Sequence, residues 1–184
     1  MPPPECETGT VTYAEWEYLA TWRFPAEYDR SETSSDPIAN APQGVVEGCR
    51  AVGLDLRCRR HGRDLDIASL WWTVSLLESG ACHIGLEQVL RPRRRARGVS
   101  AAPEFSGVGF SGLHTGYTAA MNAVLIAEHV QDDLAGYEFI QWPVEGSRLL
   151  MPEVRDGQAL WFDPGSGLVV SRIGELCSPS LPVR

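Results

Sequence analysis

The sequence predicts an α+β fold, in which an antiparallel sheet with a C-terminal β-meander packs on one long helix and on an N-terminal helix. The long helix is indicated by residues 117–135, which are rich in Ala, Met and Leu and precede Gly136. Four short β-like runs indicate the meander: residues 137–142, 148–154, 158–163 and 168–173. Asp-Gly and Pro-Gly-Ser-Gly turns separate the last three runs, and Pro152 predicts an edge position for its strand.

The elements before the long helix follow from local patterns. Residues 11–24 predict an amphipathic helix, because four apolar side chains approximate helical spacing: Trp16, Leu19, Ala20 and Phe24. Residues 54–69 alternate apolar and polar side chains around a central glycine, which predicts a β-hairpin. Residues 82–91 predict another strand or the end of one. Residues 70–77 fit a strand through their Trp, Thr and Val, or a helix capped by Ser69.

The chain of 184 residues suits a single domain. We expect this domain to span residues 11–177, between a flexible tail at 1–10 and a second tail at 178–184. Two segments inside the domain are predicted to be long loops from their Pro, Ser, Gly and Arg content: residues 25–44 and 91–112.

The charge of the chain is acidic and unevenly distributed. All sixteen basic residues are Arg and there is no Lys, which indicates a GC-rich genome. The formal net charge is −8, and only residues 48–100 are basic, with ten Arg against five acids. This balance argues against a dedicated nucleic-acid-binding protein. Nucleic-acid contact through Arg57–Arg63 and Arg91–Arg97 remains as an alternative.

Cysteine content and hydropathy point to an intracellular protein. Five cysteines at irregular spacing do not form a recognisable disulfide framework, which favours a reducing compartment. No run of about 18 apolar residues and no secretory signal occurs, so we expect neither membrane insertion nor export, and we expect a cytoplasmic protein.

A glycine-rich stretch is the first candidate site. Gly107, Gly109 and Gly112 form a literal G-x-G-x-x-G before the long helix. A nucleotide fingerprint needs a strand running into the glycines and a helix opening on the third, and neither condition is met. A weaker anion site remains a candidate, formed by these glycines with three upstream arginines: Arg93, Arg94 and Arg95.

Candidate catalytic residues are scattered. His114, His129, Cys82 and Asp133 could form an acid–base or nucleophilic set in a pocket near the Gly107–Gly112 loop. His129 and Asp133 share a helix face, but such a pair is usually solvated. Cys82 and the adjacent His83 would point to opposite faces of a strand. Zinc ligation is therefore not supported, and we expect no metal and no cofactor.

Tryptophans supply the candidate interface. Trp71 and Trp72 are adjacent, so only one of them can face the core, and an exposed Trp beside Arg is typical of an interface. Without a coherent catalytic set, the sequence favours a small acidic protein that binds a protein partner, as inhibitors, immunity proteins or adaptors do. The alternative is a small α+β enzyme or ligand-binding domain with a His- and Cys-lined pocket.

Overall fold

The computed structural model describes residues 17–27, 38–89 and 105–178, and it has an α+β fold. The helices are α1 (Gln43–Asp55), α2 (Ala119–Tyr137) and a short 3-10 turn, Ile67–Ser69. The strands of the first half are β1 (Tyr18–Pro25), β2 (Leu70–Leu77), β3 (Ala81–Gln88) and β4 (Val108–His114). Those of the second half are β5 (Val144–Glu145), β6 (Arg148–Leu149), β7 (Met151–Arg155), β8 (Gln158–Asp163) and β9 (Leu168–Arg172).

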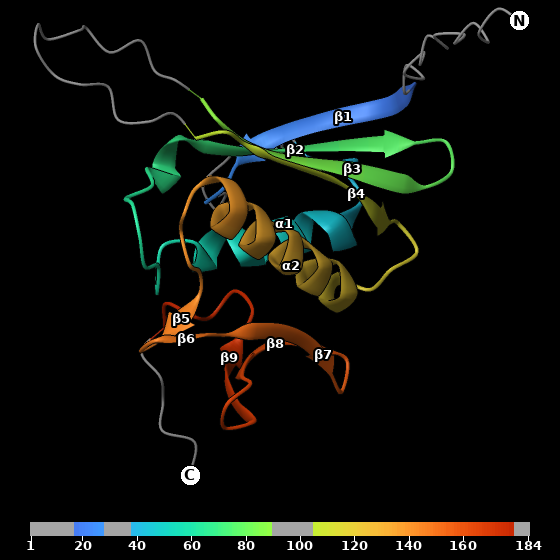
Figure 1. Cartoon of the computed structure of the whole chain (residues 1–184). Helices are drawn as coiled ribbons and strands as arrows, with labels where there is room; N and C mark the ends of the chain where they lie inside the picture. The colour runs from blue at the N-terminus through green and yellow to red at the C-terminus, as the bar shows by residue number, and fades with distance from the viewer. Residues whose placement is uncertain (1–16, 28–37, 90–104, 179–184) are drawn as a thin grey trace, which may run out of the picture.

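The elements form three layers (Figure 1). The first layer is an antiparallel sheet with the strand order β1-β2-β3-β4. The helices α1 and α2 pack against each other and cover one face of this sheet. The third layer, on the other side of the helices, is a three-stranded antiparallel sheet with the order β7-β8-β9. The predicted packing of a C-terminal meander on one long helix is therefore present.

The core lies between the four-stranded sheet and the two helices. Alternate residues of each strand point inward, and the register aligns them in rows across the sheet, as in Phe24, Trp72, Leu86 and Val108. All four of these side chains are at least nine-tenths buried. Strands with this alternation bury one face and leave the other face to solvent or to a partner.

Helix α1 depends on glycine for its close contacts. A Cβ at Gly48 would lie 2.9 Å from the backbone nitrogen of Ala123 in α2, so α1 and α2 approach closely there. A Cβ at Gly53 would overlap the carbonyl oxygen of Ala26, which follows β1. These two glycines let α1 fit between α2 and the end of β1.

The C-terminal end of α1 is tied to the C-terminal segment by Asp55. This fully buried carboxylate accepts hydrogen bonds from Trp161 Nε1 at 2.7 Å and from the backbone nitrogens of Gly174 and Leu176 at 2.7 and 2.8 Å. Burial raises the pKa of Asp55, and the three N–H donors counter part of that shift.

A disulfide between Cys58 and Cys177 joins the same two regions, with their Cα atoms 5.6 Å apart. The expectation that the cysteines form no disulfide is wrong for this pair. Cys58 and Cys177 are 119 positions apart, so the sequence spacing carried no sign of their proximity. The pairing also removes the cysteine-based argument for a reducing compartment.

Two predicted elements in the first half of the chain are wrong, and helix α1 was not predicted. Residues 18–25 form an edge strand instead of a helix, because Ala20, Trp22 and Phe24 alternate along β1 and pair with β2. Of the predicted loop at 25–44, residues 28–37 lie outside the described residues, and α1 begins near its end, where three glycines concealed the helix. Residues 54–69 are not a hairpin: they contain the end of α1, turns and the 3-10 turn.

Later elements match more closely. Residues 70–77 are a strand, and the predicted helix is α2, whose Thr118 hydroxyl caps the Met121 backbone nitrogen. Three of the four meander strands are present as β7, β8 and β9, and Pro152 lies in the edge strand β7. Residues 137–142 contribute only a bridge between Gln141 and His61. The predicted tails at 1–10 and 179–184 lie outside the described residues.

Candidate functional site

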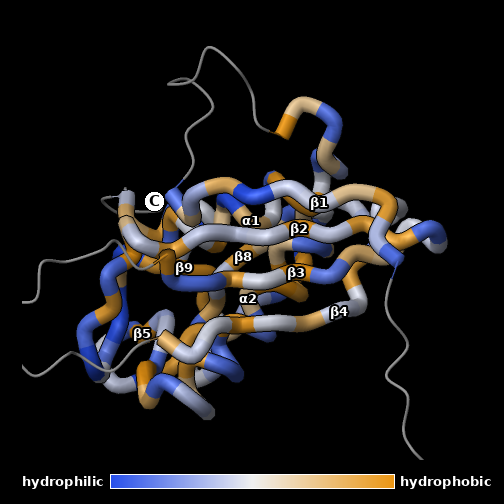
Figure 2. The backbone as a smooth tube through the Cα atoms, turned by 90° about the horizontal axis from the view of Figure 1, so that it is seen from above, coloured by the Kyte–Doolittle hydropathy of each residue, from blue (hydrophilic) through white to orange (hydrophobic). Residues whose placement is uncertain are grey.

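The face of the four-stranded sheet that points away from the helices is the most extensive candidate surface. Figure 2 looks onto this face, and the four strands lie in front of the helices. We call it the open face. Three rows of residues aligned by strand pairing define it: Thr21, Ser75, His83 and Ser111; Arg23, Thr73, Gly85 and Gly109; Pro25, Trp71 and Glu87. Tyr18 and Leu77 pair at one end of it.

Aromatic side chains stand at both ends of the open face. Trp71 is half-buried beside Pro25 and Glu87. At the other end, Tyr18 is 41% exposed, and its ring meets the His83 ring edge-on at a centroid distance of 6.3 Å. Trp72, the second interface candidate, is fully buried and belongs to the core. The prediction that only one of the two tryptophans faces the core is therefore confirmed, and Trp71 is the one available to a partner.

The centre of the open face combines two glycines with one exposed ion pair, which joins Arg23 and Glu87 at 3.4 Å. Gly85 and Gly109 lie directly opposite each other on β3 and β4. A Cβ at Gly85 would meet Thr73 Cβ only at 3.6 Å, and a Cβ at Gly109 would meet His83 Nε2 only at 3.9 Å. Rigid aromatic rings around a field of Ser, Thr and Gly resemble the composition of binding surfaces that adapt to a protein partner.

The glycine-rich stretch does not form a phosphate loop. Residues 108–112 belong to β4, so the predicted loop is wrong over this part, and its glycines serve the strand. The Gly109 backbone nitrogen donates a hydrogen bond to the Asp133 carboxylate of α2. One amide of the anion candidate is therefore occupied by an acid of the protein itself. Gly107 and Gly112 adopt positive φ angles of 89° and 112°, the first just before the strand and the second at a β-bulge within it. The arginine candidates Arg93, Arg94 and Arg95 lie outside the described residues.

The two histidine candidates lie in different surroundings. The Gly116 backbone nitrogen donates to His114 Nδ1 at 3.0 Å, so Nε2 carries the proton and donates to the Ser79 carbonyl oxygen at 3.0 Å. Both nitrogens of His114 are thus used to hold the loop between β4 and α2. His129 is exposed on α2 and stacks on Phe110, with ring centroids 4.3 Å apart.

Burial raises the pKa of both the acid candidate and the thiol candidate. Burial raises the pKa of Asp133, while His129 and the Gly109 amide lower it and Asp132 raises it. Cys82 points into the core opposite Leu76, and burial raises the pKa of its thiol. Cys82 and His83 point to opposite faces of β3, as predicted. A protonated thiol with no solvent exposure is a poor nucleophile.

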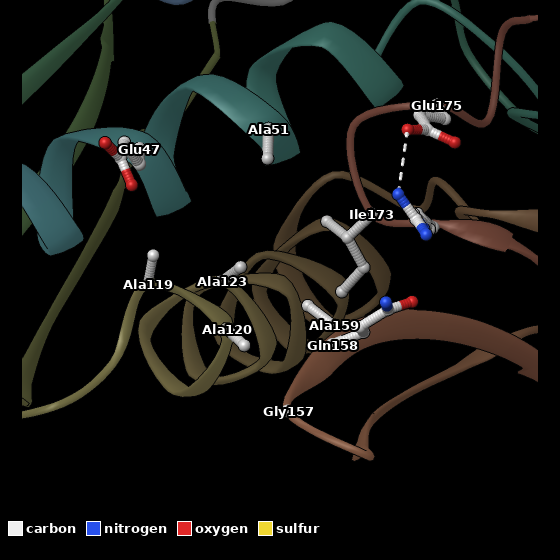
Figure 3. Close-up of a pocket in the computed structure, with 11 residues that line it drawn as sticks. Glu47, Ala51, Ala119, Ala120, Ala123, Gly157, Gln158, Ala159, Ile173 and Glu175 are labelled. Carbon is white, nitrogen blue, oxygen red and sulfur yellow. Dashed lines mark ion pairs between the residues drawn. The ribbon is translucent and has the colours of Figure 1, made fainter.

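A pocket of about 300 Å³ lies elsewhere, between α1, the first turn of α2 and the strands β8 and β9 (Figure 3). Alanine side chains from three elements form its walls, among them Ala51, Ala123 and Ala159, with Glu47 and Glu175 at its rim. Arg172 lies 4.0 Å from Glu175. None of the four catalytic candidates lines this pocket, so it does not provide the His- and Cys-lined site that the alternative function requires.

The arginines of the basic segment are engaged inside the protein. Arg57 pairs with Glu27, Arg59 with Glu145, Arg60 with Asp64 and Arg63 with the buried Glu138. These ion pairs fasten the turn after α1 to β5 and to the end of α2. The segment Arg57–Arg63 therefore does not form a free basic patch, and nucleic-acid contact through it is not supported. The second basic segment, Arg91–Arg97, lies outside the described residues.

Ion pairing leaves the described surface acidic. At least eight of the nine described arginines form ion pairs with carboxylates. Exposed acids such as Glu78, Glu128 and Asp132 form no ion pair with any described residue. Glu17 and Glu78 flank the Tyr18–Leu77 pair, so both carboxylates lie at the same end of the open face.

Sequence reasoning identified Trp71 but missed the rest of the open face. The period-two alternation of residues 70–77 and 81–88 carries the signal, since Thr73, Ser75 and His83 alternate with buried apolar residues. Within the described ranges, no group of three or more His, Cys, Asp or Glu side chains could hold a metal ion. In the same ranges, no helix is both long and apolar enough to cross a bilayer. Comparisons with protein-family models, with curated proteins and with solved structures find no match.

Proposed function

We propose that this protein acts by binding a basic protein partner through the open face of its four-stranded sheet. The observation that carries the proposal is the arrangement of this face: small Ser, Thr and Gly residues and the exposed Arg23–Glu87 ion pair lie between Trp71 and Tyr18 at its ends. A partner that covers the face would make the protein an inhibitor, immunity protein or adaptor.

The aromatic side chains supply the expected anchors. Burying a large ring against a partner removes much apolar surface from water, and Trp and Tyr are the residues most often found at interface hot spots. Thr21, His83 and Ser111 supply hydrogen-bonding groups between the two ends, whereas Ser75 in the same row is buried and bonds the Thr21 hydroxyl at 3.0 Å. Such groups add specificity without blocking close approach.

The net charge of the protein determines the sign of the charge that we expect on the partner. The chain carries −8 overall, and the described arginines are largely neutralised within the fold. Individual surface ion pairs contribute little stability, but they leave few free cations to attract an anionic partner. A basic partner would be attracted by the remaining carboxylates, and its association would weaken as salt screens them.

The test is a comparison of two single variants against one native partner. The full chain is used as bait in a lysate of its own host, and the captured protein is purified and titrated calorimetrically. Trp71→Ala should weaken binding by more than about tenfold, which corresponds to the loss of a hot-spot residue. Tyr137→Ala is the matched control, because Tyr137 is 69% exposed at the end of α2, away from the open face. Equal affinity of the Trp71→Ala variant and the wild type would refute the proposal.

A second arm separates protein from nucleic acid. The affinity for the purified partner should fall as sodium chloride is raised, while duplex DNA and single-stranded RNA should not bind at the same protein concentration. Binding of either nucleic acid with a steep salt dependence would favour contact through Arg91–Arg97 instead.

A further inference from the structure

The C-terminal sheet has an apolar outer face on the side away from the helices (Figure 1). Strand pairing arranges its residues in two rows. The first row is Met151, Phe162 and Val169, and the second is Glu153, Leu160 and Arg172. We call these six residues the outer face. The alternate residue Trp161 points the opposite way, into the core, where its Nε1 donates to Asp55.

This outer face exposes more apolar surface than a solvated sheet face requires. Met151 is 40% exposed and Val169 is 43% exposed, with the half-buried Phe162 between them. Leu160 lies on the same side by strand pairing with Glu153 and Arg172, but it is only 9% exposed and adds little to the exposed apolar surface. A contiguous apolar row across three strands is typical of an interaction surface.

We infer that a second copy of this chain covers the outer face, in a symmetric dimer whose two-fold axis runs parallel to the strands, above the central strand β8. A rotation of 180° about this axis places β7 of one protomer over β9 of its partner and leaves β8 over β8. Met151 of each protomer then faces Val169 of the other, and Phe162 and Leu160 meet their own copies on the axis. The two apolar rows therefore match without any change of register.

Charge complementarity favours the same arrangement. Glu153 and Arg172 lie at opposite ends of the second row, so the rotation brings each Glu153 over an Arg172 of the other protomer. Within one protomer Glu153 pairs with Arg155 at 2.8 Å, and Arg172 lies 4.0 Å from Glu175. All four side chains are at least 41% exposed, so these pairs contribute little and can be exchanged for pairs across the interface.

The small size of the outer face predicts a weak dimer. Three strands spaced about 4.8 Å apart present a narrow patch, whereas a stable interface needs about 800 Å² from each partner. Association should therefore depend on concentration and reverse on dilution.

Sedimentation velocity of the full chain, from low to high micromolar concentration, tests this inference. The wild type should shift towards the dimer as concentration rises, and Val169→Asp should raise the dimer dissociation constant at least tenfold. Leu19→Asp is the matched control, because Leu19 is 59% exposed on β1, outside the C-terminal sheet, and the change should leave association as in the wild type. Circular dichroism checks that each variant is folded.

A second test reverses the charges of Glu153 and Arg172. Its outcome does not depend on whether the Val169→Asp variant folds. Glu153→Arg alone and Arg172→Glu alone should each weaken association, because each places like charges opposite one another. The double variant should restore it. A wild type that stays monomeric at every concentration overturns the inference, and so does a double variant that associates no better than the single ones. The inference does not depend on the proposed partner, because the open face lies in the other sheet.

Discussion

Gly53 shows at the scale of one residue how tightly α1 fits against β1. Replacing a glycine by alanine in a helix normally stabilises it by about 1 kcal/mol. At Gly53, however, the new Cβ would overlap the Ala26 carbonyl oxygen and would lie 2.9 Å from its carbonyl carbon. Because overpacking against backbone costs typically about 1–3 kcal/mol or more, we expect Gly53→Ala to lower the free energy of unfolding by roughly 2 kcal/mol. Urea denaturation followed by circular dichroism measures the change.

Gly136 is the matched control for Gly53. It lies in the last turn of α2, and a Cβ there would meet nothing within 4 Å. Gly136→Ala should therefore leave the free energy of unfolding unchanged or raise it by up to about 1 kcal/mol. If both variants changed stability in the same direction, the close approach of α1 to Ala26 would be contradicted.

Asp163 gives a prediction about acid stability. It accepts hydrogen bonds from Ser166 Oγ at 2.8 Å and Gly165 N at 2.9 Å, and it pairs with Arg148 at 2.8 Å. The Ser166 hydroxyl, with the Gly165 amide and Arg148, holds the pKa of this carboxyl below its ordinary value of 3.8. A lowered acid pKa stabilises the fold at pH values above 3.8, and this stabilisation is lost as pH falls through the lower, folded-state pKa.

Asp163→Asn should therefore make the free energy of unfolding depend less on pH in the acid range. At neutral pH the variant should be less stable than the wild type, and the difference should shrink as the pH falls below 4, where the wild-type carboxyl becomes protonated. Ser166→Ala removes one donor only and should give an intermediate slope. Denaturation at a series of pH values measures this, and parallel curves for wild type and Asp163→Asn would contradict it.

At the scale of elements, a segment could be predicted from the sequence when local features stabilise it. It could not be predicted when contacts with distant parts of the chain stabilise it. β8 and β9 were predictable because their alternation and flanking turns are local features. Helix α1 was not, because its three glycines lower helix propensity by roughly 1 kcal/mol each. These glycines permit close tertiary contacts, such as the approach of Gly48 to Ala123. β1 was misassigned because its apolar residues fit both helical and alternating spacing, and only pairing with β2 distinguishes the two.

The contact between α1 and the C-terminal segment rests on the Asp55 carboxylate. In Asp55→Asn an amide group would replace one carboxylate oxygen, so Trp161 Nε1 and the backbone nitrogens of Gly174 and Leu176 could not all keep an acceptor. Because a buried donor without an acceptor costs about 1–3 kcal/mol, we expect a loss of roughly 2 kcal/mol in the free energy of unfolding. Trp161→Phe removes one donor and should cost less. Thermal unfolding of both variants tests the ranking, and the reverse order would contradict it.

At the scale of the whole molecule, the sequence allowed the sign of the charge and one anchor of the open face to be predicted. The acidic total and Trp71 are visible in the composition and the local pattern. The rest of the open face was not predictable, because it depends on which side of the sheet the helices cover. The engagement of Arg57–Arg63 by distant acids such as Glu138 and Glu145 likewise depends on tertiary contacts. Charge counted by segment therefore suggested a basic patch that the fold neutralises.

The disulfide extends this long-range coupling to the whole chain. Cys58 and Cys177 are 119 positions apart, so their bond restricts most of the unfolded chain. In the chain-entropy description a loop of this length stabilises the folded state by about 4–5 kcal/mol. We expect Cys177→Ser, or reduction of the wild type, to lower the melting temperature markedly. Reductant should have little further effect on the variant.

The buried thiols provide the control for this experiment. Cys49 and Cys82 are free thiols that lie in the core, so neither contributes a bond that the reductant could break. Peptide mapping without reductant should recover Cys58 and Cys177 in one cross-linked species. If the wild type melted at the same temperature with and without reductant while the cross-linked peptide was present, the bond would not stabilise the fold. In that case Asp55 and the packing of Ile173 and Leu176 would hold the C-terminal segment in place.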